Sequence, residues 1–217
     1  MHLVRPPGVY RAADDTSLLA DVMRRGGYAR GRRVLDLGCG TGALALAAAR
    51  AGAASVTAVD LSLRSIAATW LNARAHRAPV VVRRGDLFEP VRGQAFDLVL
   101  ANPPYVPAPT PALPRHRIAR CWDAGVDGRQ VLDRICAGAV RALTRDGTVL
   151  IVQSEVCDES ATVARMREAG LRAQVIERSI VPFGPVMRAR AALLEGRELL
   201  EPGRREEELV VVEARRA

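Results

Sequence analysis

The sequence contains no lysine, so all 32 of its basic residues are arginine. An arginine-only, alanine-rich composition is typical of a GC-rich genome, and no more than two arginines stand next to each other anywhere in the chain. The net charge of +8 therefore favours an acidic or RNA-rich partner only weakly, because most of these residues are expected on a solvated surface. Aromatic residues make up only 4%, so the core must consist mainly of small aliphatic side chains, which suits close packing of helices on a sheet.

Metal-ligand patterns and long apolar runs are missing as well. The four cysteines, Cys39, Cys121, Cys136 and Cys157, are far apart and form no CxxC pair or Cys/His cluster, which argues against a metal site. The N-terminus lacks the apolar segment of a signal peptide, and no stretch reaches the roughly 18 apolar residues of a membrane helix. We therefore expect a cytoplasmic protein with reduced thiols and no membrane contact.

The length of 217 residues, with 49% hydrophobic and 26% charged residues, predicts one compact domain in which strands and helices alternate around a parallel sheet. Strands are predicted at 33–37, 55–60, 80–82, 96–101, 148–152, 172–178 and 209–213. Helices are predicted at 14–26, from about 43 to 50, and at 62–76, 128–143 and 158–169. Asp14 to Ser17 are expected to cap the first helix, and the polar stretch 183–207 predicts a hairpin insertion or a mobile loop.

A glycine-rich loop follows the first predicted strand, with Gly38, Gly40 and Gly42 directly before a helix. Glycine lets the backbone turn tightly and lets a ligand approach, and the helix N-terminus offers free N–H donors. The dinucleotide fingerprint is G-x-G-x-x-G, whereas this loop reads G-x-G-x-G, which argues against NAD or FAD. Asp36 precedes the loop, where it either faces a cofactor or caps the helix.

Acidic residues also follow the second and third predicted strands. Asp60 ends the second strand, where a carboxylate accepts the hydroxyls of a ribose, and Asp86 follows the third. The glycine loop and Asp60 resemble motif I and its acidic partner in S-adenosylmethionine-dependent methyltransferases, and this resemblance implies that Asp86 contacts an adenine amino group. A positively charged adenosyl ligand suits these acids better than a pyrophosphate. Cys39 is expected to face it as a small residue and not as a nucleophile. The candidate cofactor-binding residues in this part of the chain are Asp36, Gly38, Cys39, Gly40, Gly42, Asp60, Leu61, Asp86 and Leu87.

The tetrapeptide Asn102-Pro103-Pro104-Tyr105 opens a proline-rich loop at 102–114, directly after the fourth predicted strand. Transfer of a methyl group to a planar NH2 nitrogen requires that nitrogen to be held in line with the S–CH3 bond. An asparagine oxygen and a proline carbonyl can accept its two N–H protons, the prolines stiffen the loop, and the tyrosine ring offers a face for a flat amide or base. We take these four residues as catalytic, with Asn102 also touching the cofactor.

The glycine loop, Asp60, Gly85-Asp-Leu87 and the tetrapeptide together resemble the HemK-type protein-(glutamine-N5) methyltransferase family, over about residues 9–155. This resemblance implies S-adenosylmethionine (SAM) as the cofactor and the GGQ glutamine of a peptide-chain release factor as the methyl acceptor. It also implies a Rossmann-like class I methyltransferase fold, with a mostly parallel seven-stranded sheet, flanking helices and an antiparallel late strand. Within one domain at 1–217, the expected parts are a helical cover at 1–30, a cofactor and catalytic core at 31–155, and a C-terminal helix with strands at 156–217.

The N-terminal segment from Gly8 to Leu19 looks like the opening of the short archaeal and eukaryotic branch of this family, although Ala12 stands where that branch has proline. The resemblance implies that Thr16 contacts the cofactor and that a small zinc-binding activator subunit is a partner. Amino methylation of adenine or guanine in RNA or DNA stays open, since the same tetrapeptide serves it, although a base in a duplex must first be flipped out. Methylation of a small molecule also stays open, and so does a catalytically idle scaffold that only binds SAM.

Overall fold

A seven-stranded sheet forms the centre of the computed structural model, which describes residues 2–112 and 118–216. The strands are β1 (Arg33–Leu37), β2 (Ser55–Asp60), β3 (Val80–Arg84), β4 (Phe96–Ala101), β5 (Leu143–Ser154), β6 (Leu171–Pro182) and β7 (Glu206–Arg216). Their order is β3-β2-β1-β4-β5-β7-β6, and the pairs among the first five strands are parallel. β7 runs antiparallel between β5 and β6, so the predicted mostly parallel sheet with an antiparallel late strand is confirmed.

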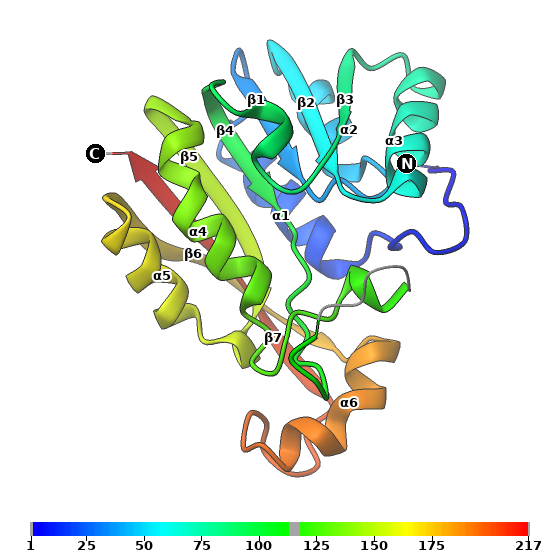
Figure 1. The fold of residues 1–217 in the computed structure, drawn as a ribbon, viewed down its shortest axis with the longest axis vertical. Helices are drawn as coiled ribbons and strands as arrows, with labels where there is room; N and C mark the ends of the chain where they lie inside the picture. Colours follow the sequence, from blue (N-terminus) through cyan, green and yellow to red (C-terminus); the bar gives the residue numbers. More distant parts are fainter. Residues whose placement is uncertain (1, 113–117, 217) are drawn as a thin grey trace.

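Helices cover both faces of this sheet, as Figure 1 shows. The helices are α1 (Asp14–Arg25), α2 (Ala43–Arg50), α3 (Leu63–Ala75), α4 (Gln130–Ala142), α5 (Glu159–Glu168) and α6 (Pro185–Glu195), with short 3-10 helices η1 (Glu89–Val91), η2 (Ile118–Cys121) and η3 (Glu155–Cys157). Alternate strand residues face opposite sides, so Val34 packs with α1 and α2 while Leu35 packs with α4 and α5. This arrangement buries both faces of the parallel strands.

Strand register brings the expected site together at one edge of the sheet. Leu37 of β1 is paired with Val59 of β2 on one side and with Ala101 of β4 on the other. The next residue along each strand is therefore Gly38, Asp60 or Asn102, and the three lie next to one another. Because β1 continues toward β2 while β4 lies on its other side, this edge is a topological switch point, where open α/β sheets bind their ligands.

One sequence-based expectation is wrong in the structure, and another is confirmed in part. Asp14 to Ser17 lie in the first turn of α1 and not before it, and the N-cap is Ala13, which makes no side-chain cap hydrogen bond. The stretch 183–207, expected as a hairpin insertion or a mobile loop, is the insertion between the antiparallel strands β6 and β7, and it contains the helix α6, which lies beyond the end of the sheet beside the loop that follows β4. Of the proline-rich loop at 102–114, positions 113 and 114 lie outside the described residues.

In the part of the chain that the structure describes, no helix is long and apolar enough to cross a membrane.

Gly42 gives a stability prediction for the glycine loop. It has φ +82° at the N-cap of α2, and an added Cβ would lie 2.9 Å from Thr69 Cγ2 of α3. Gly203 has almost the same φ, +83°, but an added Cβ would meet nothing within 4 Å. We expect Gly42→Ala to lower the free energy of unfolding by about 1–3 kcal/mol more than Gly203→Ala, since only the former adds overpacking to the backbone strain. Equal losses in urea titrations would show that α2 and α3 do not pack as described.

Candidate active site

The first two glycines of the loop after β1 face open space. Gly38 (φ +72°) and Gly40 (φ +56°) have left-handed backbones, and a Cβ at either would meet nothing closer than 4.0 Å. Gly42 differs, because a Cβ there would collide with Thr69, so this glycine is required for helix packing. The loop is therefore a cradle at Gly38 and Gly40 and a packing contact at Gly42.

Asp60 closes this cradle from the side of β2. One carboxylate oxygen accepts a hydrogen bond from the Gly40 N–H (3.0 Å), and the other accepts from the Ser62 N–H (2.8 Å). Burial raises the pKa of Asp60, while those backbone donors and the nearby charge of Arg120 act to lower it. The structure thus fixes the carboxylate at the end of β2, where the sequence predicted a ribose contact. Leu61, the next residue, is 38% exposed.

Asp36 and Cys39 support the loop from inside the protein. Asp36 is fully buried, its Oδ2 accepts from the Ala45 N–H of α2 (2.9 Å), and its Oδ1 has no hydrogen-bond partner within the described residues. Burial raises its pKa to about 7. The Cys39 thiol lies 3.2 Å from the Thr69 hydroxyl, and burial raises its pKa well above the ordinary value. The thiol is directed toward α3, so a ligand in the cradle would meet the backbone of Cys39 instead of its side chain.

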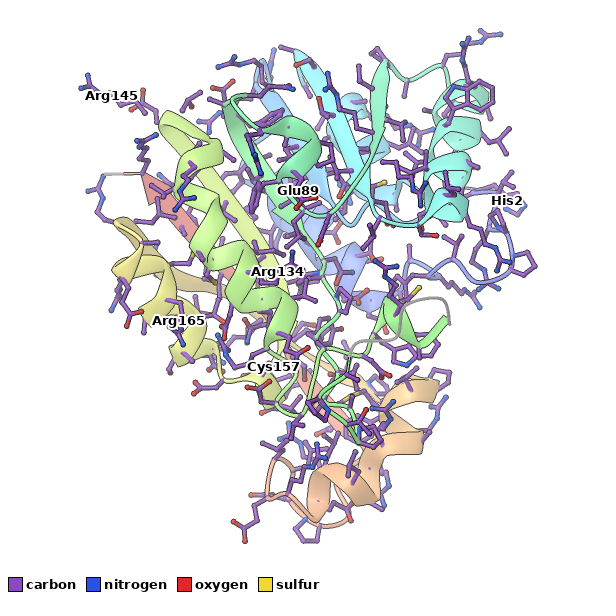
Figure 2. The ribbon with its side chains drawn as sticks, viewed as in Figure 1. His2, Glu89, Arg134, Arg145, Cys157 and Arg165 are labelled. Atoms are coloured by element: carbon purple, nitrogen blue, oxygen red, sulfur yellow. The ribbon has the colours of Figure 1, made fainter. Side chains whose placement is uncertain are left out.

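The loop after β3 carries Asp86 and Leu87. Asp86 forms an ion pair with Arg134 of α4 (2.7 Å), and Leu87 adopts a positive φ of +47°, which is strained for a leucine. Both line a cavity of about 260 Å³ between this loop and α4, and Glu89 and Arg134, labelled in Figure 2, contribute to the same wall. The Asp86 carboxylate is thus held toward α4 in the lining of this cavity.

Asn102 is half-buried at the end of β4, and its Nδ2 donates to the Thr16 hydroxyl of α1 (3.0 Å). This contact brings together two residues that were assigned on separate grounds, Asn102 to catalysis and the cofactor from its tetrapeptide, and Thr16 to the cofactor from the family resemblance. With Nδ2 donating to Thr16, the carbonyl oxygen Oδ1 is the acceptor that this amide has left for a ligand. Pro103 is buried and Pro104 is half-buried, and both restrict the loop to one backbone path.

Tyr105 was expected to offer its ring to a flat amide or base, but the structure gives it a different role. Its side chain belongs to the hydrophobic core and is 9% exposed, and its hydroxyl donates to Asp15 Oδ2 (3.0 Å). Its backbone carbonyl accepts from the Cys157 thiol (2.7 Å), which lies below α4 in Figure 2. The ring therefore offers no open face to a substrate and instead anchors the tetrapeptide, because a buried tyrosine needs a partner for its hydroxyl.

Three acidic or aromatic residues beneath the tetrapeptide were missed by sequence reasoning. Asp15 is 4% exposed and also accepts from the Tyr10 hydroxyl (2.7 Å). Glu207 of β7 is 5% exposed, and the charge of Asp15 contributes to raising its pKa. The helical pattern at 14–26 placed Asp15 in a cap, and no sequence pattern marked Glu207 among its neighbouring glutamates, so only their tertiary contacts identify them.

Arginines of the C-terminal insertion hold the loop that follows the tetrapeptide. Arg190 of α6 donates to the Pro107 carbonyl (2.6 Å) and pairs with Asp123 (2.7 Å), both partners being largely buried. Arg197 donates to the carbonyls of Ala108 (3.0 Å) and Val126 (2.8 Å). The stretch 183–207 thus holds the loop that follows β4 in place. No local signal marked these two arginines among the many others.

The N-terminal segment closes the other side of the site. The Asn72 side chain of α3 pairs with both the N–H (2.8 Å) and the carbonyl (2.9 Å) of Val4, and it also donates to the Thr41 carbonyl of the glycine loop (2.9 Å). Asn72 is 1% exposed, so these bonds are shielded from water. One amide therefore ties the N-terminal cover to the cradle.

The site suits a cationic nucleoside better than an anionic one. The cradle at Gly38 and Gly40 leaves space for a ligand backbone or sugar, Asp60 stands beside it, and Asp36 leaves one buried oxygen without a partner behind it. Carboxylates disfavour phosphates and favour a sulfonium or ammonium group. The described residues therefore fit SAM, and Asn102 lies next to Gly38 at the same edge of the sheet.

Comparisons with known proteins agree with this chemistry. Residues 1–111 match the family described as "Methyltransferase small domain". A Methanocaldococcus jannaschii protein named for N5-glutamine methyltransferase activity is 32% identical over 181 residues, 83% of this chain and 90% of that protein. A release factor glutamine methyltransferase of Xylella fastidiosa is 35% identical over 165 residues, 73% of this chain but 60% of the relative. A ribosomal protein uL3 glutamine methyltransferase of Bradyrhizobium diazoefficiens is 42% identical over 125 residues, 54% of this chain and 39% of the relative.

Among solved structures, the complex of Mtq2 with Trm112 from E. cuniculi, which methylates the termination factor eRF1, contains a chain with a TM-score of 0.67 and 22% identity. The match covers 97% of this chain and 99% of that one. At this identity the likeness concerns the fold, and it confirms the Rossmann-like class I methyltransferase architecture expected from the sequence.

Glu207 gives a pH prediction for stability. Burial, reinforced by the charges of Asp15 and Glu155, raises its pKa from 4.5 to about 7. A raised folded-state pKa means that the stability present below pH 4.5 is lost as the pH rises through 7. We expect Glu207→Gln to remove that loss, so its advantage over wild type should grow by on the order of 2 kcal/mol between pH 4 and pH 8. The exposed neighbour Glu206 supplies the control, Glu206→Gln. Parallel pH profiles for all three proteins would contradict a buried Glu207.

Proposed function

Because the chain belongs to the SAM-dependent protein-glutamine methyltransferases of the methyltransferase small domain family, we propose that it methylates a glutamine side-chain nitrogen, specifically the GGQ glutamine of a release factor. The observation that carries this proposal is the geometry of Asn102. Its Nδ2 donates to the Thr16 hydroxyl (3.0 Å), which leaves the carbonyl oxygen Oδ1 as the atom of this amide that can accept from a substrate. A side-chain amide of a substrate offers two N–H donors, which such an acceptor recognises.

We divide the site into two half-sites, one that binds the cofactor and one that holds the methyl acceptor. We assign Asp60 to the ribose hydroxyls and the open loop at Gly38 and Gly40 to the cofactor backbone. SAM, when bound, supplies a methyl group carried by a sulfonium. Asn102 Oδ1 and the Pro103 carbonyl accept the two amide N–H groups, which holds the acceptor nitrogen in plane and stabilises the positive charge that develops on it.

The names of the relatives favour protein glutamine over a nucleobase as the acceptor. The M. jannaschii and X. fastidiosa proteins are both named for glutamine methylation, and the archaeal relative is matched over 90% of its length. The B. diazoefficiens relative is named for uL3 instead, so ribosomal protein is the competing glutamine source. The chain spans only 60% of the Xylella enzyme and 39% of the uL3 enzyme, and its resemblance to the short archaeal relative therefore weighs more.

We also propose a small activator subunit, since the Mtq2 structure is a complex with Trm112. The described surface offers β3 for this contact. β3 pairs only with β2 and ends the sheet, and Val81 on it is 54% exposed. Trp70 (49%) and Leu71 (44%) of the adjacent α3 are exposed as well. An open strand edge flanked by apolar side chains suits a partner that adds a strand.

The acceptor is tested by incubating the purified protein with labelled SAM and, separately, host release factor, ribosomal protein uL3 and bulk RNA. We expect label on the release factor, and none on a release-factor variant whose GGQ glutamine is changed to glutamate. Asn102→Ala should reduce labelling by about 100-fold or more, because the acceptor of the amide N–H is lost. Label on uL3 or RNA alone would overturn the release-factor assignment.

The activator surface is tested by co-purification with the host's Trm112-like protein. We expect Val81→Glu to abolish the complex, because a charge on the strand edge opposes strand addition. Ile180→Glu is the matched control, since Ile180 is 62% exposed on β6, the opposite edge of the sheet. If Val81→Glu still forms the complex while Ile180→Glu does not, the partner binds the other edge.

A further inference from the structure

A buried carboxylate joins the N-terminal cover to the catalytic loop. Asp15 Oδ2 accepts from the hydroxyls of both Tyr10 (2.7 Å) and Tyr105 (3.0 Å). Its Oδ1 accepts from the Thr16 backbone N–H (2.5 Å) and from the Thr16 hydroxyl (3.2 Å). Asp15 is 4% exposed and Thr16 is 8% exposed, so water competes little for these bonds.

The direction of the hydrogen bonds follows from the chemistry of the carboxylate. An ionised carboxylate only accepts, so the single proton of the Thr16 hydroxyl points to Asp15. The lone pairs of that hydroxyl are then free to accept from Asn102 Nδ2 (3.0 Å). A threonine in this state has no proton to donate to the Asn102 carbonyl. The chain of bonds therefore admits one orientation of the Asn102 amide.

We propose that Asp15 and Thr16 are positioning residues that keep the Asn102 carbonyl oxygen, and not its NH2 group, directed at the methyl acceptor. This inference rests on the proposed function, since it concerns the group that accepts the substrate N–H. The two ends of an asparagine amide have nearly the same shape. A flipped Asn102 would fit the same space but would present a donor to the two N–H donors of a glutamine amide.

The same contacts explain why the N-terminal segment belongs to the catalytic unit. Tyr10 lies in the cover before α1, and Tyr105 ends the catalytic tetrapeptide, yet both donate to one oxygen of Asp15. The cover thus sets the orientation of a catalytic side chain through Asp15, besides closing the site. Thr16 acts on transfer through Asn102, and this role is separable from the cofactor contact that the family resemblance implies for it.

Thr16→Val tests the proposal, because valine has nearly the shape of threonine but cannot accept from Asn102. We expect the single-turnover rate of methyl transfer at saturating SAM to fall by about 10–100-fold. Thr16→Ser keeps the hydroxyl and should stay within about 3-fold of wild type. The matched control is Thr144→Val, which removes another threonine-to-aspartate hydrogen bond, to Asp97 Oδ1 (3.0 Å). This bond lies at the start of β4 and β5, at the end of these strands that is away from the site. Thr144→Val should transfer at the wild-type rate.

A second readout needs no methyl acceptor. Hydrogen exchange of the Asn102 side-chain NH2, followed by NMR, should be slow in wild type and Thr16→Ser and fast in Thr16→Val. Transfer at the wild-type rate by a folded Thr16→Val would overturn the positioning role, and so would fast exchange in wild type. If wild type shows slow exchange yet methylates no glutamine, the proposed function fails while the orientation of Asn102 stands.

Discussion

The pairing of Leu37 with both Val59 and Ala101 is the constraint on which the site depends. It brings the ends of β2, β1 and β4 into line, so that Asp60, Gly38 and Asn102 follow one another across a single edge of the sheet. A slip of one residue would reverse the side chains of a strand and separate the half-sites. The apolar alternation that packs α1 and α2 on one face and α4 and α5 on the other holds this register in place.

Three aspartates lie at this edge of the sheet, and they differ in their hydrogen-bond partners. Asp60 is satisfied by two backbone N–H donors, Asp36 has one unpartnered oxygen, and Asp15 collects four donors. Burial raises the pKa of Asp36 and Asp60. An edge lined by such acids favours a cationic ligand, which relieves their mutual repulsion. The acids of the site and the arginines elsewhere in the chain must therefore be considered separately. The net charge of +8 describes the whole chain and gives no information about the charge of the site.

The features that could be predicted from the sequence are those that lie close to a recognisable strand in the chain. The glycine loop, Asp60 and the tetrapeptide each stand at the end of a strand of recognisable pattern, so their meeting at one edge could be predicted. The late antiparallel strand was implied by the family resemblance. The sequence did not predict the bond between Asp15 and Tyr105, the contacts of Arg190 and Arg197 or the burial of the Tyr105 ring, because these contacts join segments 67 to 90 residues apart. The cap expected from Asp14 to Ser17 was wrong because the helix already begins at Asp14, and Asp15 uses its second carboxylate oxygen for two tyrosine hydroxyls.

We propose that this edge of the sheet holds two adjoining half-sites, a cofactor half around Asp60 and a transfer half around Asn102. Calorimetry of SAM binding and single-turnover transfer at saturating SAM, in the same preparations of Asp60→Ala and Asn102→Ala, separate the two halves. We expect Asp60→Ala to weaken SAM binding by about 1–3 kcal/mol and to keep transfer at saturation, because ribose hydroxyls lose their acceptor. We expect Asn102→Ala to keep SAM binding and to lose transfer. Loss of binding in Asn102→Ala with full transfer at saturating SAM, or unchanged binding in Asp60→Ala, would rule out this division of the site.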